Sequence, residues 1–264
     1  MKISPSIYFV AGILLLASCT PKQSSESYET VEESTESTSL KLSLAPPSPQ
    51  FPDASLIKKD LVIEEADSLY SLNYSFEVSN YELGAQTSDA AERGIANSGK
   101  GQHIHYIVNN GPYAAHYMSD VPDELAAGNY VVLAFLSRSY HESVKSEGAY
   151  FIENITVGDV APSEADLTAP HLFYSRPKGT YAGADTAKVM LDFYLLNTSI
   201  STDGNKILAT INGEEFMVTE WAPHYIEGLP LGESTIKLEL IDADGNPIEG
   251  PFNAVERTIT LSES

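Results

Sequence analysis

Cysteine and basic residues are both scarce in this chain of 264 residues. Cys19 is the single cysteine, so no intrachain disulfide can form, and any folded domain must be held together by its core alone. Lysine and arginine total 15 against 37 aspartates and glutamates, which gives a formal charge of −22. Such a surface repels phosphate backbones and offers no basic stripe. The composition therefore excludes nucleic acid as a partner.

The first twenty residues contain no apolar run long enough to span a membrane. Lys2 precedes an apolar stretch from Ile7 to Ala17, and eleven helical residues at about 1.5 Å each cover only about half of a 30 Å hydrocarbon core. This is the pattern of a signal peptide. The residues Leu-Ala-Ser-Cys that end it resemble the bacterial lipobox, and the resemblance implies cleavage before Cys19 and acylation of its thiol and new amino group. A membrane is therefore an expected partner, through lipid on Cys19.

Residues 19–52 are poor in apolar side chains and rich in Ser, Thr, Glu and Pro. Such a segment buries too little surface to offset its ordering entropy, and we interpret it as a lipidated cysteine followed by a disordered acidic and proline-rich tether. Thr20, rather than an aspartate, follows the cysteine. In lipoprotein sorting schemes this resembles an outer-membrane address, on either face of that membrane.

Motifs that carry known reactions are missing. The chain has no G-x-S-x-G elbow, phosphate loop, H-E-x-x-H or C-x-x-C sequence. The turn from Asp242 to Asn246 has oxygen ligands in a row but lacks the spacing and closing glutamate of an EF-hand. We therefore expect a non-catalytic protein.

The chain does contain an internal repeat. With an offset of 104, the segment from Glu124 to Glu142 aligns with Gly228 to Asn246, and Ile155 to Val157 aligns with Ile259 to Leu261. Upstream the offset grows to 117, because the first copy has an extra polar, glycine-rich loop at residues 84–101. The repeat predicts two copies of one structural unit.

Both copies consist of short runs with strand-like alternation, separated by turn signals and without helical periodicity. This pattern predicts an all-β protein of two tandem immunoglobulin-like antiparallel β-sandwich domains. The expected organisation is a signal peptide at 1–18, a tether at 19–52, a first domain at 53–160 and a second at 166–264. The short proline-bearing linker between the domains predicts that they are stacked end to end.

Two resemblances support this interpretation. The run GLPLGESTIKLELIDADGN resembles the late strands of immunoglobulin-like bacterial modules. Most of residues 50–261 resembles a family of uncharacterised bacterial lipoproteins labelled "phosphopeptide-binding protein", through the runs GQHIHYIVNNGPYAAHY, LSRSYHES, LFYSRPKGTY and LDFYLLNT. The resemblance implies phosphopeptide binding, but phosphate recognition requires clustered arginines, and the four arginines of this chain are spread along it.

Histidines provide the candidate metal chemistry. Four of the six, His103, His105, His116 and His141, lie within 39 residues of the first domain. His103 and His105 share one face of a strand, and a hairpin could bring His116 near them. Sets of histidines suit copper or zinc. The alternative is that they are ordinary titrating side chains at the surface.

The second copy serves as an internal control for their orientation. If the turn at residues 109–111 is gapped, Ile104 and Tyr106 align with core-facing Ile207 and Ala209, and the histidines are expected to point outward. Without the gap, they would face the core. No histidine of this group has a counterpart in the second copy, so the fold does not need them.

These observations favour a lipid-anchored cell-envelope protein that acts as a non-catalytic binding or structural module, with an envelope protein or glycan as partner. Aromatic residues near turns could stack on sugars or on a partner protein: Tyr106, Tyr113, Tyr117, Tyr140, Phe173, Tyr174, Tyr181, Trp221 and Tyr225. Paired acids for glycoside chemistry can come from distant parts of a sequence, which leaves a carbohydrate-active role open. The main alternative is a periplasmic or surface copper- or zinc-binding lipoprotein that uses the histidines of the first domain.

Overall fold

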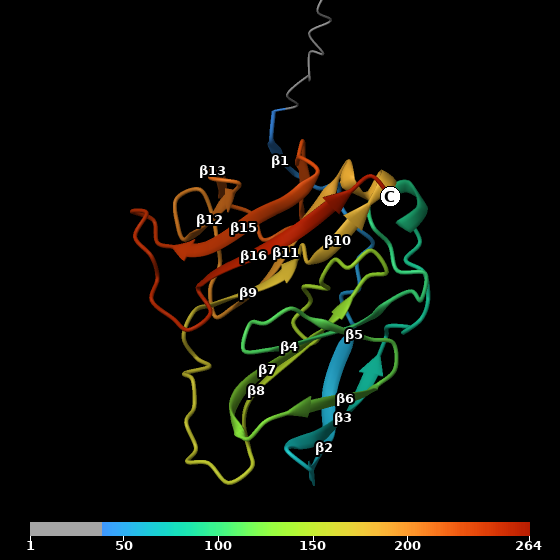
Figure 1. Ribbon diagram of the computed structural model, residues 1–264, viewed down its shortest axis with the longest axis vertical. Helices are drawn as coiled ribbons and strands as arrows, with labels where there is room; N and C mark the ends of the chain where they lie inside the picture. The colour runs from blue at the N-terminus through green and yellow to red at the C-terminus, as the bar shows by residue number, and fades with distance from the viewer. Residues whose placement is uncertain (1–38) are drawn as a thin grey trace, which may run out of the picture. The chain divides into compact units, whose positions relative to one another are not determined.

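The computed structural model describes residues 39–264 (Figure 1). Cys19, the signal peptide and most of the expected tether lie outside them. The described part of the chain consists of strands and two short 3₁₀ helices, and it includes no helix of the length and hydropathy that a membrane crossing requires. The first sandwich contains β2 (Ser55–Ala66), β3 (Leu69–Ser79), η1 (Ala90–Glu92), β4 (His103–Val108), β5 (Ala114–His116), β6 (Asp120–Leu125), β7 (Gly128–Ser137) and β8 (Tyr150–Val157). The second contains β9 (His171–Arg176), β10 (Gly179–Ala182), η2 (Gly183–Thr186), β11 (Val189–Leu196), β12 (Lys206–Ile211), β13 (Glu214–Val218), β14 (His224–Glu227), β15 (Gly232–Ile241) and β16 (Ala254–Ser262), and β1 (Lys41–Leu44) joins it.

The two copies have the same topology, which confirms the predicted tandem sandwich. In the first, a sheet ordered β2-β3-β6 faces a sheet ordered β5-β4-β7-β8. In the second, β9-β11-β14 faces β13-β12-β15-β16. Within both copies these strands pair in antiparallel fashion, and the second copy adds β10, which runs parallel to β16. The offset of 104 relates β7 to β15, and in Figure 1 the two copies form two separate groups of strands.

Corresponding strands of the copies differ in how many of their faces are buried. Strand β15 alternates between buried and partly exposed residues along STIKLELI, because one face of it meets solvent. Its counterpart β7 ends in a run of seven buried residues, VVLAFLS. A strand buried on both faces needs apolar side chains at every position. The sequence difference therefore marks β7 as covered on its outer face.

The cover for β7 comes from the second sandwich. Each copy has a core of its own, and a third cluster of buried residues combines Leu133 and Phe135 of β7 with Phe173 of β9 and Tyr194 of β11. The rings of Phe135 and Tyr194 stack with centroids 4.7 Å apart. The copies thus pack sheet face against sheet face, and the expectation of end-to-end stacking was wrong. It failed because the length of the linker does not fix the packing angle.

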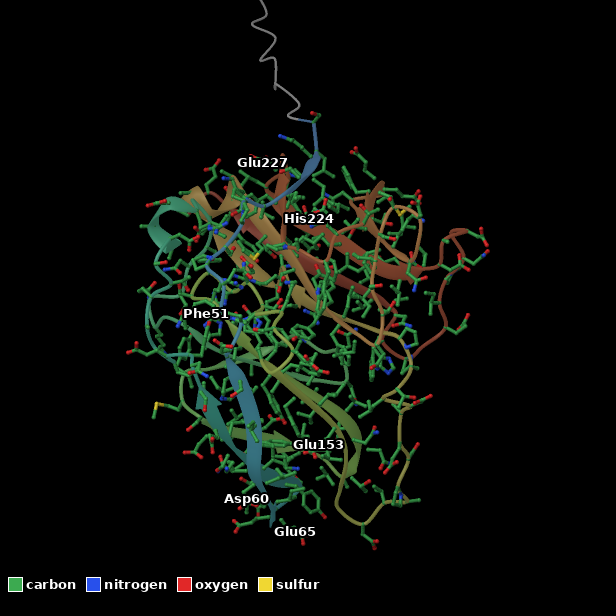
Figure 2. All side chains as sticks on the ribbon, turned by 180° about the vertical axis from the view of Figure 1, so that it is seen from behind. Phe51, Asp60, Glu65, Glu153, His224 and Glu227 are labelled. Carbon is green, nitrogen blue, oxygen red and sulfur yellow. The ribbon has the colours of Figure 1, made fainter. Side chains whose placement is uncertain are left out.

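The sandwiches are also joined by the segment that precedes the first copy. Strand β1 pairs with β14, and Leu42 packs on the core of the second copy. The chain then crosses to the first copy, where Pro46 and Pro47 accept hydrogen bonds from Arg93 and Pro49 accepts from Arg138. In Figure 2 Phe51, near the end of this segment, lies at a height between His224 in one copy and Glu153 in the other.

The expected tether therefore ends earlier than residue 52. Residues 39–52 belong to the fold, because backbone carbonyls of a proline-rich segment are good acceptors for buried guanidinium groups even where side chains supply little apolar surface. All strand pairings described above lie among residues 39–264. A chain of residues 20–264 therefore contains every strand pairing described here.

Candidate metal centre

Three histidines meet in the interior at the boundary between the two sandwiches. His103 and His105 project from β4, and His141 lies in the turn after β7. Nε2 of His103 lies 3.0 Å from Nε2 of His105 and 3.0 Å from Nδ1 of His141, and one ligand atom from each ring falls within 4.8 Å of the others. In a tetrahedral site with metal–nitrogen bonds of about 2.0–2.1 Å, neighbouring ligands are about 3.3 Å apart. We call these three rings the histidine cluster; two of its three nitrogen pairs are close to that spacing, and the third lies within 4.8 Å.

The far nitrogens of the two strand histidines are occupied by other groups. Nδ1 of His103 lies 2.9 Å from the carbonyl oxygen of Gly101, which can only accept a hydrogen bond, so the proton of His103 sits on Nδ1 and its Nε2 carries a lone pair. Nδ1 of His105 lies 3.2 Å from the hydroxyl of Ser175. Partners of this kind fix the tautomer and the ring orientation of metal-binding histidines.

No placement of protons gives each close pair of ring nitrogens in the cluster a normal hydrogen bond. His103 Nε2 offers one in-plane lone pair, yet it faces two imidazole nitrogens at 3.0 Å. If both neighbours donate to it, two donors share one acceptor; if either does not, two lone pairs face each other. A cation between the three nitrogens would satisfy all of them at once.

The structure corrects the expected orientation of the histidines. Ile104 and Tyr106 do face the core of the first copy, as the gapped alignment predicted, and His103 and His105 lie on the opposite face. That face is not at the surface, since both histidines have an exposed fraction of 0%. The second sandwich covers it with Ser175 of β9. Alignment of one copy with the other revealed the face, but could not reveal that the other copy occludes it.

His116 does not belong to the cluster. It pairs directly with Ile104 across the β4–β5 hairpin, and directly opposed residues of an antiparallel ladder point to the same face. Its ring therefore lies on the core side, 5.9 Å from that of Tyr106. The expectation that the hairpin would bring His116 to the other histidines was wrong because Ala115, not His116, is the partner of His105.

His141 occupies a backbone position that suits glycine. Its φ of 72° lies in the left-handed region, and its counterpart at the offset of 104, Gly245, has a φ of 89°. The two turns are the same, since Arg138 and Asp242 bond to Glu142 and Asn246 in the same pattern. A side chain in this conformation costs roughly 1 kcal/mol or more. In the first copy this conformational cost accompanies a histidine whose ring belongs to the cluster.

The extra loop at residues 84–101 holds the turn that carries His141. Thr87 and Ser139 exchange hydrogen bonds between backbone N–H groups and hydroxyls, at 3.2 and 3.0 Å. The backbone N–H of Ser98 donates to the carbonyl of Ser139 at 2.8 Å. The loop ends at Gly101, whose carbonyl orients His103. The insertion that the second copy lacks therefore positions two of the three histidines.

Burial keeps the histidine cluster neutral. It lowers the pKa of His103 to about 4, an effect to which the positive charges of Arg176 and Lys178 add. The pKa of His105 lies well below its usual range through burial and the proximity of the other two histidines. Burial also lowers the pKa of His141. Neutral imidazole is the form that binds metal ions, so the ligands are ready at neutral pH.

Several residues beside the cluster were not anticipated from the sequence. The ring of Tyr113 stacks on His105 with centroids 3.6 Å apart, and its hydroxyl lies 3.2 Å from Nδ1 of His141. Arg176, the last residue of β9, and Lys178, which follows the strand, lie near the same tyrosine ring. Together with Ser175 they belong to the run SRPK, which begins in the last two residues of β9. This polar run was the signal available in the sequence, but His105, which Ser175 contacts, lies 70 residues away from it.

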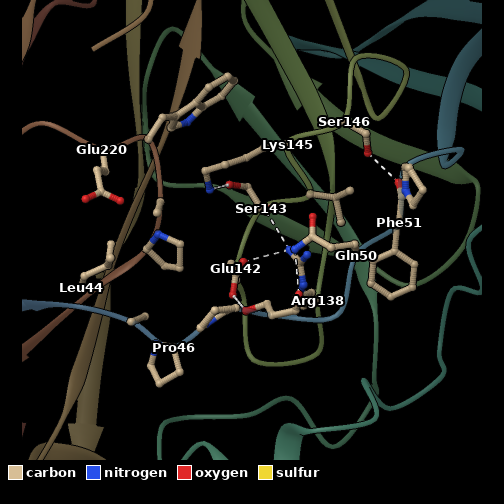
Figure 3. A pocket seen from close by; sticks show the side chains of 18 of the residues that line it. Leu44, Pro46, Gln50, Phe51, Arg138, Glu142, Ser143, Lys145, Ser146 and Glu220 are labelled. Atoms are coloured by element: carbon tan, nitrogen blue, oxygen red, sulfur yellow. Dashed lines mark hydrogen bonds and ion pairs between the residues drawn. The ribbon is translucent and has the colours of Figure 1, made fainter. Parts of the chain in front are cut away.

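A separate cavity of about 670 Å³ lies beneath the segment that joins the sandwiches (Figure 3). Its walls include Phe51, Trp221 and the ion pair of Arg138 with Glu142, together with Lys145, which pairs with Asp192. Lys145 Nζ lies 2.7 Å from Asp192, and Figure 3 shows it bonded to Ser143. Glu147 and Glu220 also line the cavity, and neither forms an ion pair among the described residues.

The aromatic residues expected to stack on sugars are mostly internal. Seven of them have exposed fractions of 5% or less: Tyr106, Tyr113, Tyr140, Phe173, Tyr174, Tyr181 and Tyr225. Their rings fill cores and contacts between the sandwiches because the copies pack face to face. An aromatic platform for a glycan therefore does not arise from them.

The arginines do not form the cluster that phosphopeptide recognition needs. The guanidinium of Arg93 bonds to Asp89 and to proline carbonyls, and that of Arg138 pairs with Glu142. Arg257 donates to the carbonyls of Asn110 and Gly111. Most of the donors that would grip a phosphate are therefore engaged inside the protein.

Comparison with known proteins yields distant likenesses of fold. No protein-family model matches the chain, and no curated protein matches it. Among solved structures, the fibronectin(III)-like modules of Clostridium thermocellum CbhA are 11% identical, with 77% of this chain and 95% of that one covered and a TM-score of 0.27. The central fibronectin-III array of RIM-binding protein is also 11% identical, with 83% and 72% covered and a TM-score of 0.26. The Bacteroides ovatus protein SGBP-B, solved with a mixed-linkage heptasaccharide, is 14% identical, with 83% and 47% covered and a TM-score of 0.22. At these scores the likenesses say nothing about function.

Proposed function

We propose that this protein is a non-catalytic, lipid-anchored envelope protein that binds a transition-metal ion through His103, His105 and His141. The observation that carries the proposal is the convergence of three neutral imidazoles, two of them buried and that of His141 half-buried. Two of the three nitrogen pairs are 3.0 Å apart, and the far nitrogens of the strand histidines are held by Gly101 and Ser175. Imidazole ligands suit copper and zinc.

The strained turn supports the same function. A histidine that served only to fill space would be replaced without loss by the glycine found in the second copy, where the turn has the same hydrogen bonds. The insertion at residues 84–101 adds bonds to this turn and to His103. Conformational cost and added structure together point to a site that is built for a ligand rather than for stability.

Anchoring is the second part of the proposal. Cleavage before Cys19 and acylation would leave residues 20–40 between the lipidated cysteine and the first described strand. The acidic chain, with its charge of −22, would also attract cations from the surrounding solution. We place the protein in the outer membrane of a bacterium, with its sandwiches exposed to the aqueous phase, where soluble thiol ligands that compete for metal are scarce.

Titration of residues 20–264 with Zn(II), Cu(II) and Cu(I) tests the proposal. We expect one ion per chain at submicromolar dissociation constants for at least one of these ions, measured against a competing chelator. His141→Gly should abolish this binding while the protein stays folded, because the turn favours glycine. His224→Gln, a histidine outside the cluster that bonds to the carbonyl of Ala222, is the matched control. Binding that survives His141→Gly would refute the metal centre.

A further inference from the structure

The histidine cluster has a fourth donor atom at hand. Besides the three imidazole nitrogens, the phenol oxygen of Tyr113 lies 3.2 Å from Nδ1 of His141, and among the described residues this is its one hydrogen bond. Because the Tyr113 ring lies nearly parallel to that of His105, 3.6 Å away and tilted by 10°, the oxygen is held on the same side as the imidazoles. Three histidines leave one position of a tetrahedral metal open.

Tyr113 is fixed in place from both faces of its ring. His105 covers one face, so the ammonium of Lys178, 3.9 Å from the ring centroid, must lie over the other. Lys178 also donates a hydrogen bond to the backbone carbonyl of Tyr113. With an exposed fraction of 3%, the side chain has little freedom to leave the cluster. This is the preorganisation that a ligand needs.

The charges around this tyrosine are positive and lack acidic partners. Arg176 lies 6.0 Å from the ring, its Nε is buried without a hydrogen-bond partner, and Arg257 bonds to the carbonyls of residues 110 and 111 just before Tyr113. Among the described residues no carboxylate forms an ion pair with Arg176, Lys178 or Arg257, although the protein has 37 acidic residues. A doubly charged metal ion beside these cations would need a nearby negative charge.

We infer that Tyr113 is the fourth ligand of the metal centre and binds as a phenolate, which distinguishes the site from a three-histidine site closed by water. The inference rests on the proposed function. On binding, the phenol O–H bond breaks, the oxygen electron pair forms the bond to the metal, and the proton passes to solvent; no atom changes its oxidation state. The negative oxygen offsets the charge of the ion and is itself stabilised by Lys178 and Arg176.

Absorption and resonance Raman spectra of residues 20–264 loaded with Cu(II) test this assignment. We expect a phenolate-to-copper charge-transfer band in the visible region, with enhanced tyrosinate vibrations. Both should be lost in Tyr113→Phe, which keeps the ring on His105 and lacks only the oxygen. Tyr117→Phe is the matched control, since the Tyr117 ring lies 5.1 Å from that of His103 but its hydroxyl bonds to Ser98. The control should keep the band.

The outcomes separate the two ideas. If copper binds and the histidine variants lose it, but the wild type shows no such band and takes up azide as readily as Tyr113→Phe does, the fourth position belongs to solvent. That result overturns the assignment of Tyr113 and leaves the metal centre intact. If copper and zinc fail to bind at all, the proposed function fails as well. A band that persists in Tyr113→Phe would also overturn the assignment.

Discussion

His116 lies directly opposite Ile104 in the ladder between β4 and β5, which turns its imidazole toward the core of the first sandwich. The histidine cluster lies on the other face of β4. Because His116 contacts none of the three ligands, we expect His116→Ala to leave metal affinity within about twofold of the wild type. His105→Ala should lose binding. Competitive titration with a zinc chelator measures both, and a large loss in His116→Ala would contradict the assigned face.

The buried histidines should make the metal-free protein sensitive to acid. The pKa of His103 is about 4 when folded, against 6.5 when exposed, so the unfolded chain binds more protons between these values. Stability is therefore fully present above pH 6.5 and is lost as the pH falls toward 4. The contribution of His103 is about 3 kcal/mol. Urea unfolding from pH 4 to 7 should show a steeper pH dependence for the wild type than for His103→Gln. Parallel curves for the two proteins would contradict this.

Asn110 joins the two sandwiches through three hydrogen bonds. Its side-chain amide donates to the carbonyls of Leu172 and Phe252 and accepts from the backbone N–H of Tyr174. Its φ of 56° suits glycine, so Asn110→Gly removes these bonds without backbone strain. We expect a loss of about 2–4 kcal/mol in the free energy of unfolding, since buried partners are left unsatisfied. Asn212→Gly, at an exposed turn with a φ of 48°, should cost less than half as much.

The segment before the first copy should be essential for stability. Removing residues 1–38 should leave the melting temperature of the soluble protein unchanged, because the described pairings all lie beyond them. Removing residues 1–52 strips β1 from β14 and takes the carbonyl acceptors from Arg93 and Arg138. We expect a loss of at least about 3 kcal/mol from the buried guanidinium groups alone. Calorimetry of chains 39–264 and 53–264 makes the comparison. Equal melting temperatures would show that the segment is only a tether.

Much of the fold could be predicted from the sequence because the chain contains its own reference copy. The offset of 104 between β7 and β15, and the apolar alternation of Ile104 and Tyr106 against Ile207 and Ala209, identified the strands and their core faces. Within the site, His103, His105 and His141 were identified as candidates. The repeat gives correct local structure wherever both copies meet the same surroundings.

Two of the errors concern contacts between segments far apart in the chain, and one concerns a hairpin register within the first copy. Burial of His103 and His105 depends on Ser175 and its strand, which no spacing within the first copy reveals. Tyr113 looked like a turn aromatic because its contacts with Lys178 and His141 come from two other segments. His116 was assigned to the wrong face because a hairpin register shifted by one residue exchanges inside and outside.

Face-to-face packing of the sandwiches has a consequence for how such a site can arise. One copy by itself would display the β4 imidazoles to water, where protons and solvent compete for them. The second copy of the same unit packs over that sheet and buries the strand histidines. It also contributes Ser175, Arg176 and Lys178, from a segment of different sequence. Duplication of one unit can therefore create a buried site, because one copy covers the ligands that the other copy presents.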